Sequence, residues 1–118
     1  MPRSKNSQKL LKNKIVPPEK VVQMHILQWL NMNNFFHWRQ NNLAVKGRTF
    51  IGMKGIPDII VIYPPDGRFI GIECKKKGNK QTSDQEIFQL RLESSGGIYI
   101  LAYEVEDVIK VFKDLMSK

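Results

Sequence analysis

The chain has 118 residues, a length typical of one folded domain. Its 19 Lys and Arg residues exceed its 11 Asp and Glu residues, which gives a formal net charge of +8. This balance favours a polyanionic partner such as nucleic acid, although a generic basic surface is the alternative. A single cysteine excludes an internal disulfide and any zinc site built from cysteines. No run reaches the roughly 18 apolar residues of a membrane helix, so we expect a soluble protein of the cytoplasm with no membrane partner.

The first 16 residues differ in composition from the remainder. Cations recur among Asn, Ser and Gln, and they are Arg3, Lys5, Lys9, Lys12 and Lys14. We predict a flexible basic arm over residues 1–16 and a folded domain over residues 17–118. The arm either contacts the backbone of a nucleic acid or is an ordinary frayed terminus.

A helix is predicted to begin at Pro17-Pro18-Glu19 and to end between residues 31 and 34. Val22, Ile26 and Leu30 recur at helical spacing, which indicates one buried face. Glu19 suits the positive end of the helix dipole, and its alternative role is that of a ligand to a metal or to water. His25 and His37 lack a partner histidine at ligand spacing, which favours packing or surface roles for both.

Residues 35–39 are predicted to form the first strand. Two basic segments that contain glycine follow, at residues 46–50 and 53–55, directly before Asp58. Such segments are either phosphate clamps beside an active site or solvated charged loops.

The next two apolar runs, residues 59–63 and 68–72, flank a turn cluster and predict a β-hairpin. A turn of two or four residues centred on Pro65-Asp66 pairs Tyr63 with Arg68 and places Asp58 opposite Glu73. Lys75 then shares their face of the sheet. A three-residue turn over 65–67 would instead place Asp58 beside Cys74. The local pattern allows both registers, and we take the first on functional grounds, because it gathers two carboxylates and a lysine.

The second half of the chain predicts a β-α-β-α series. Thr82 and Gln85, or Ser83 and Glu86, have capping-box spacing, and a helix with Ile87, Phe88, Leu90 and Leu92 on its apolar side is expected to end at Gly96-Gly97. A strand over residues 98–103, covered on both faces, and a helix over residues 105–116 follow. The predicted fold class is α/β, a sandwich on a mixed β-sheet with the order α-β-β-β-α-β-α.

The chemistry of these residues suits a hard cation. Two neighbouring carboxylates repel each other, and Mg²⁺ relieves that repulsion while using oxygen ligands. Asp58, Glu73 and the carbonyl of Cys74 would form such a site, with Lys75 beside an activated water molecule. The alternative is a surface patch of ion pairs. The side-chain amide of Gln85 either reaches the scissile phosphate or Lys75 from the start of its helix, or serves as a capping partner of Thr82.

These residues resemble a known family. Gly55-Ile56-Pro57-Asp58, Ile72-Glu73-Cys74-Lys75 and Thr82-Ser83-Asp84-Gln85, with Glu19 heading the first helix, are similar to the VRR-NUC domain of the PD-(D/E)XK nuclease superfamily. The resemblance covers roughly residues 17–110. It implies a restriction-endonuclease-like fold and DNA cleavage that depends on Mg²⁺ or Mn²⁺. It also implies that Asp58 and Glu73 bind the metal, Lys75 is the catalytic lysine, and Gln85 and Glu19 are accessory.

Stand-alone members of that family resemble Holliday-junction resolvases and act as homodimers in bacteria and phages. We therefore expect a homodimeric, structure-selective endonuclease that acts on branched DNA, such as a four-way junction, in a bacterial cell or a phage-infected host. The alternatives are a non-catalytic DNA-binding module of the same fold and a restriction-type enzyme that cuts linear duplex. Residues 35–38 and the final helix are candidate dimer contacts, but we rank core packing first for both.

Overall fold

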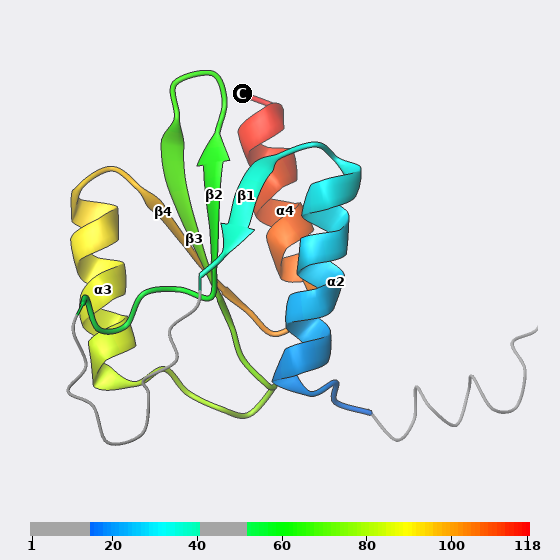
Figure 1. The fold of residues 1–118 in the computed structure, drawn as a ribbon, viewed down its shortest axis with the longest axis vertical. Coiled ribbons are helices and arrows are strands. Elements are labelled where there is room, and N and C mark those ends of the chain that lie inside the picture. The colour runs from blue at the N-terminus through cyan, green and yellow to red at the C-terminus, as the bar shows by residue number, and fades with distance from the viewer. Residues whose placement is uncertain (1–14, 41–51) are drawn as a thin grey trace, which may run out of the picture.

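A computed structural model describes residues 15–40 and 52–118 of the chain (Figure 1). Residues 1–14 of the predicted arm and the predicted basic segment 46–50 lie outside the described residues. The elements, in order, are α2 (Glu19–Met32), β1 (Phe36–Arg39), β2 (Ile59–Tyr63), β3 (Arg68–Cys74), α3 (Ser83–Ser94), β4 (Ile98–Ala102) and α4 (Val105–Met116). This order confirms the predicted α-β-β-β-α-β-α series within the described part of the chain.

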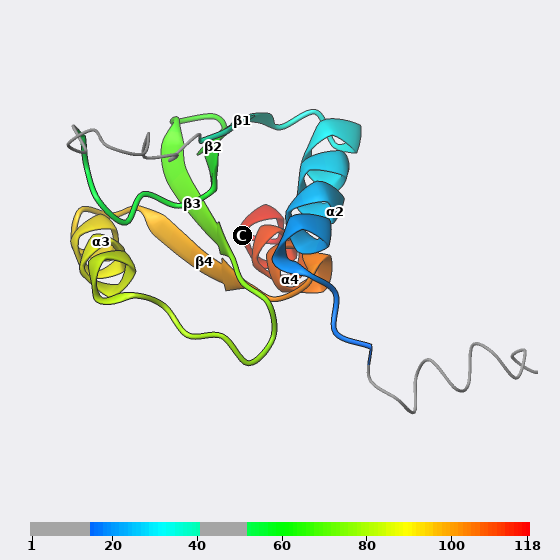
Figure 2. The same cartoon turned by 60° about the horizontal axis from the view of Figure 1, so that its bottom comes forward.

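The strands form one mixed sheet in the order β1-β2-β3-β4. β1, β2 and β3 pair antiparallel, whereas β3 and β4 pair parallel and are joined through α3. Helices α2 and α4 lie on one face of the sheet and α3 lies on the other, as the two views of the ribbon show (Figures 1 and 2). The protein is therefore an α/β structure with helices on both faces of a mixed sheet, as predicted.

The hairpin between β2 and β3 adopts the register that pairs Tyr63 with Arg68 and Ile59 with Ile72. Residues 64–67 form its turn, and the Gly67 amide donates to the carbonyl of Tyr63 over 3.0 Å. The three-residue alternative is therefore wrong, because four residues separate the last pair of the ladder. Continued by one residue, this register places Asp58 opposite Glu73.

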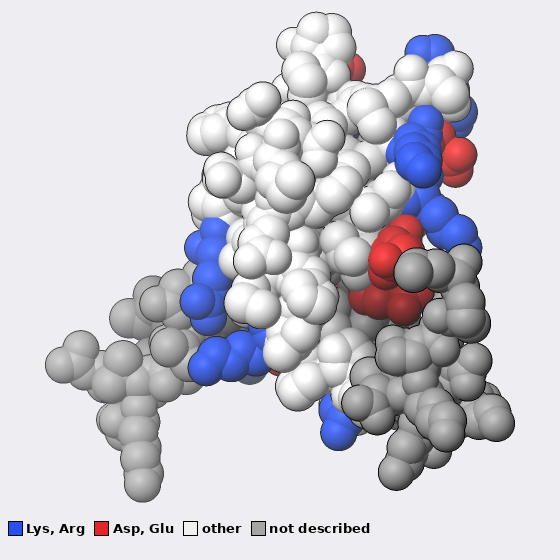
Figure 3. Space-filling view, turned by 90° about the vertical axis from the view of Figure 1, so that its right-hand side faces the viewer, with Lys and Arg blue, Asp and Glu red and all other residues white. Residues whose placement is uncertain are grey.

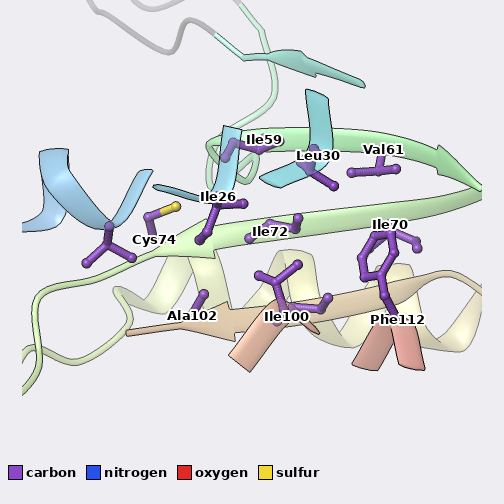
Figure 4. Packing of buried hydrophobic residues seen from close by; sticks show 12 residues of the cluster. Ile26, Leu30, Ile59, Val61, Ile70, Ile72, Cys74, Ile100, Ala102 and Phe112 are labelled. Atoms are coloured by element: carbon purple, nitrogen blue, oxygen red, sulfur yellow. The ribbon is translucent and has the colours of Figure 1, made fainter. Parts of the chain in front are cut away.

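The main core lies between the sheet and the two helices α2 and α4 (Figure 4). It consists of alternate residues of β2, β3 and β4 together with one face of each helix, and its labelled members in Figure 4 are Ile26, Leu30, Ile59, Val61, Ile70, Ile72, Cys74, Ile100, Ala102 and Phe112. Cys74 occupies an apolar position at the end of β3, and burial raises the pKa of its thiol well above the ordinary value. The cysteine therefore behaves as a small core residue.

The aromatic stretch of the first strand is divided between the two faces of the sheet. Phe35 packs against Trp29, Tyr63 and Phe112 at ring-centroid distances of 4.8 to 6.0 Å. Phe36 and Trp38 are exposed. Core packing, our first choice for the whole stretch, is thus confirmed for Phe35 and wrong for Phe36 and Trp38, because successive side chains of a strand point to opposite faces.

Helix α3 is less buried than its sequence suggested. Ile87 and Leu90 of the predicted apolar side are exposed, and Phe88 and Leu92 are only partly buried. Among the described residues, no other helix lies beside α3 on its face of the sheet, whereas α2 and α4 pack beside each other on the opposite face (Figures 1 and 2). A lone helix has fewer neighbours to cover its apolar side.

The face formed by α2 and α4 has a broad uncharged centre, with Lys and Arg at its margins (Figure 3).

Within residues 15–40 and 52–118, no helix combines the length and the apolar character needed to cross a bilayer.

The central packing of α4 can be tested by truncation. Phe112 is fully buried and contacts three other aromatic rings, so Phe112→Ala is expected to lower the free energy of unfolding by about 3–5 kcal/mol. Urea denaturation measures this change. Met116 on the same helix is 55% exposed, and Met116→Ala is expected to change the free energy by less than about 1 kcal/mol. Equal losses from the two substitutions would contradict this account of the core.

Candidate active site

Asp58 lies at the entrance to β2, and two backbone contacts fix its position. Its carbonyl accepts a hydrogen bond from the Gln40 amide over 2.7 Å, which extends the pairing of β1 with β2 by one residue. Its carboxylate Oδ2 accepts a hydrogen bond from the Cys74 amide over 2.8 Å. The side chain of Asp58 is therefore turned toward the end of β3, where Glu73 lies.

Two glycines allow the segment before Asp58 to approach its neighbours closely. A Cβ atom at Gly71 on β3 would lie 2.7 Å from Cγ of the buried Pro57, a clash that glycine avoids. Gly55 has φ of +76°, and a Cβ there would lie 2.3 Å from the Asp84 carbonyl oxygen in the first turn of α3. The Gly55-Ile56-Pro57-Asp58 segment is thus held between β3 and α3.

Glu73 is a buried acid, with only 3% of its surface exposed. Its Oε1 accepts a hydrogen bond of 2.5 Å from the side-chain amide of Gln85, whereas the buried Oε2 meets no N–H donor among the described residues, and the neighbouring carboxyl group of Asp58 is close enough to share a proton with Glu73. Burial, followed by the neighbouring Asp58, raises the pKa of Glu73 to about 8, and the charge of Lys75 acts in the opposite direction. Two carboxyl groups therefore share one poorly hydrated site.

Gln85 is the capping partner of Thr82, as one of the two alternatives had it, and its side chain also contacts Glu73, which the sequence had not indicated. Its Oε1 accepts from the Thr82 amide over 2.9 Å, and its backbone amide donates to the Thr82 hydroxyl over 3.2 Å, which closes the capping box of α3. The remaining side-chain amide group donates to Glu73. The helix cap thus orients the residue that holds the buried acid.

Lys75 follows the last residue of β3. Its backbone amide donates to the Ala102 carbonyl over 3.0 Å, which continues the pairing with β4 and keeps the alternation of the strand. Its side chain is partly exposed and lies near enough to Glu73 for its charge to lower the pKa of that acid. The structure therefore brings Asp58, Glu73, Lys75 and Gln85 to one place.

Glu19 lies at the periphery of this group. It is the first residue of α2 and is exposed. After burial, Asp58 and Glu73, its charge is the smallest of the four causes that raise the pKa of Cys74, so Glu19 lies on the side of the strand end that carries the thiol.

A metal ion would take few of its ligands from acidic side chains. In the part of the chain that the structure describes, no three His, Cys, Asp or Glu residues are grouped closely enough to hold a metal. The two histidines also lie apart from any such group: His25 is exposed, and Nδ1 of His37 lies 2.7 Å from the Phe35 carbonyl oxygen. Asp58 and Glu73 would therefore need the Cys74 carbonyl and water to complete an octahedral shell.

Tyr99 and Gln81 are neighbours of the site that sequence reasoning missed. Tyr99 is paired with Gly71 and is nearly buried, and burial above all raises its pKa to about 12, with smaller contributions from Glu73 and Asp58. The Gln81 side chain donates to the Tyr99 hydroxyl over 3.1 Å and to Gln89 over 3.0 Å. The hydroxyl group within the apolar run 98–102 was the available signal, because a buried tyrosine needs a polar partner.

Comparison of the chain with protein families, with curated proteins and with solved structures finds no match.

The raised pKa of Glu73 predicts how stability depends on pH when no metal is added. In the unfolded chain this carboxyl group loses its proton near its ordinary value of 4.5, whereas in the folded protein it keeps the proton up to about pH 8. The unfolded state therefore binds fewer protons between these values, and stability falls as pH rises through them. Between pH 5 and 9, the free energy of unfolding is expected to fall by on the order of 2–4 kcal/mol less in Glu73→Gln than in the wild-type protein. Urea denaturation in EDTA measures this difference. An unchanged pH profile in the variant would contradict the assignment.

A second pair of variants separates the two roles of Gln85. Thr82→Ala removes only the hydroxyl group of the cap and is expected to cost about 1 kcal/mol of unfolding free energy. Gln85→Ala also leaves Oε1 of Glu73 without its donor, which is expected to cost about 1–3 kcal/mol more. Chemical denaturation at pH 7 measures both. If Thr82→Ala and Gln85→Ala lower the free energy of unfolding equally, the contact between Gln85 and Glu73 does not stabilise the protein.

Proposed function

We propose that this protein is an endonuclease that hydrolyses phosphodiester bonds of branched DNA with Mg²⁺ or Mn²⁺ as its cofactor. The observation that carries the proposal is the pair of neighbouring acids, Asp58 and the buried Glu73, because Oε2 of Glu73 meets no N–H donor among the described residues and faces a second carboxyl group. Two acids in one buried site cannot both ionise without a cost in free energy, and a bound cation relieves their repulsion.

The residues present fit a hard divalent cation. Asp58 and Glu73 offer carboxylate oxygens, and the carbonyl of Cys74 lies between Glu73 and Lys75 in the chain. Mg²⁺ commonly takes one or two protein carboxylates and retains several waters, so a set of two acids is sufficient for it. When bound, the ion supplies Lewis-acid activation of a water molecule and of the phosphodiester.

The protein's own residues position the reacting groups. The Cys74 amide holds Asp58 through Oδ2, and Gln85 holds Glu73 through Oε1, so the orientation of each acid is fixed by a separate contact. Lys75 places a positive charge beside them, where it orients the attacking water or offsets the negative charge that develops on the phosphate. Glu19 would act from the start of α2 as a more distant ligand to water.

The charge pattern supports a nucleic-acid substrate. The exposed residues Lys76 and Lys77 directly follow Lys75, the exposed Lys80 lies three residues after Lys77, and the whole chain carries a net charge of +8. Lysines in this position would bind phosphates on either side of the scissile bond without reading the base sequence. The N-terminus of α3, which carries Gln85, adds backbone amides that favour anions.

The finer features of the proposal follow from the resemblance to VRR-NUC nucleases. The order of elements is compatible with a restriction-endonuclease-like sandwich. A homodimer would present two sites related by a two-fold axis, which suits the two opposed strands of a four-way junction.

Cleavage of a labelled four-way junction in Mg²⁺ tests the proposal. Asp58→Ala, Glu73→Gln and Lys75→Ala are each expected to lower the cleavage rate by at least about 100-fold, because each removes charge from the reacting centre. The matched control is Asp66→Ala, which removes an exposed acid of the hairpin turn and is expected to cleave at the wild-type rate. Lys77→Ala removes one of the proposed phosphate-binding lysines, and we expect it to weaken binding in a salt-dependent way without abolishing cleavage.

Other outcomes of the same assay separate the alternatives. Cleavage that persists in both the Asp58 and Lys75 variants would remove the site assignment. Tight binding of the junction with no cleavage in Mg²⁺ or Mn²⁺ would identify a DNA-binding module. Sequence-dependent cuts in linear duplex would identify a restriction-type enzyme.

A further inference from the structure

Two exposed aromatic side chains lie on the same face of the sheet as the candidate active site. Phe36 and Trp38 of β1 pair with Ile62 and Ile60 of β2. Directly paired residues share a face, and Asp58 is two residues from Ile60, so Trp38, Phe36 and Asp58 all belong to one face. By the hairpin register, Glu73 belongs to this face as well.

The surroundings of the two rings leave them open to a flat ligand. Phe36 is 68% exposed and Trp38 is 40% exposed, and their centroids are 5.8 Å apart with an interplanar angle of 55°. The indole N–H of Trp38 already donates to Oε1 of Gln40 over 3.0 Å. Because the single donor of the indole is satisfied by the strand's own neighbour, the exposed remainder of both rings is apolar and aromatic.

Trp38 is the aromatic residue nearer to the acids, and Phe36 lies one step farther away. Trp38 and Asp58 are diagonal neighbours on adjacent strands, a relation that places their Cα atoms about 7–8 Å apart. The link is direct, since the Gln40 amide donates to the Asp58 carbonyl and the Gln40 side chain accepts from Trp38. Phe36 lies one further same-face step along β1, about 7 Å from Trp38.

The chemistry of the patch favours a nucleobase over a protein partner. A stable protein interface buries about 1,200–2,000 Å² in total, far more than two side chains on one edge strand provide. An unpaired base offers a planar π-face of matching size, and base–aromatic stacking does not depend on the base sequence. The base also brings its own phosphate, for which Lys75 beside the two acids provides a cation.

We propose that Phe36 and Trp38 stack the unpaired bases next to the scissile phosphodiester, so that this surface selects DNA in which a strand has left the duplex. The inference rests on the proposed function for the position of the phosphate, and it adds a determinant of substrate structure. Paired bases in an intact duplex keep their faces covered by their neighbours and cannot stack on these rings.

Binding in EDTA tests the proposal without requiring cleavage. Three fluorescent probes are compared: a blunt duplex, the same duplex with a single-stranded tail, and the same duplex with a tail of abasic nucleotides. The abasic tail keeps the phosphate charge and lacks the bases. Wild-type protein is expected to bind the normal tail about 10-fold more tightly than the abasic tail, within the range given by stacking on an aromatic side chain.

Variants at the patch complete the test. The double variant Phe36→Ala with Trp38→Ala is expected to lose this preference and to bind the duplex and the abasic tail as wild type does. Trp38→Tyr is expected to retain most of it, which guards against a folding defect. Leu90→Ala is the matched control, because it removes an apolar side chain that is 67% exposed on α3.

Three outcomes would overturn the stacking role: a wild-type protein indifferent to the abasic tail, a double variant that weakens all three probes equally, or a double variant that changes the sedimentation mass instead, as a protein contact would. The proposed nuclease activity is tested separately. If the wild-type protein prefers the normal tail over the abasic tail but does not cleave in Mg²⁺, the nuclease proposal fails and the stacking proposal stands.

Discussion

The placement of two carboxyl groups opposite each other across one hairpin is the constraint on which the rest of the structure depends. Asp58 and Glu73 meet there because the four-residue turn sets the register, and they remain there because a backbone amide holds one and Gln85 holds the other. This arrangement costs folding free energy when Glu73 is ionised, because burial disfavours its charged form and raises its pKa. The core on the far side of the sheet, which includes Ile59 and Ile72, has to compensate for that cost.

Much of this could be predicted from the sequence, because local patterns dictated it. Alternation and turn residues located the hairpin, and the two possible capping boxes placed the start of α3 within one residue, of which the structure adopts the one headed by Thr82. The register of the hairpin could not be predicted from the local pattern, because the turn residues at 64–67 allow two registers. We selected the register that places Asp58 opposite Glu73 on functional grounds, and the ladder has that register, with Ile59 paired to Ile72.

What the sequence could not give depends on contacts between distant elements. The apolar residues of α3 were expected to be covered, yet Leu90 is exposed, because only the tertiary arrangement reveals that α3 has no neighbouring helix. Tyr99 escaped notice for the same reason, since its proximity to Glu73 arises from the parallel pairing of β3 with β4. The outward orientation of Phe36 and Trp38 followed from strand alternation once the faces of β1 were known.

Burial of Cys74 has a practical consequence for work on this protein. A thiol that stays protonated and enclosed is a poor nucleophile, so maleimide and iodoacetamide reagents should leave it intact in the native state. Cys74 is the single cysteine of the chain, so the native protein is expected not to react with thiol reagents. A spin label or fluorophore could then be attached at a chosen surface position through one added cysteine, without first removing a residue that adjoins both acids.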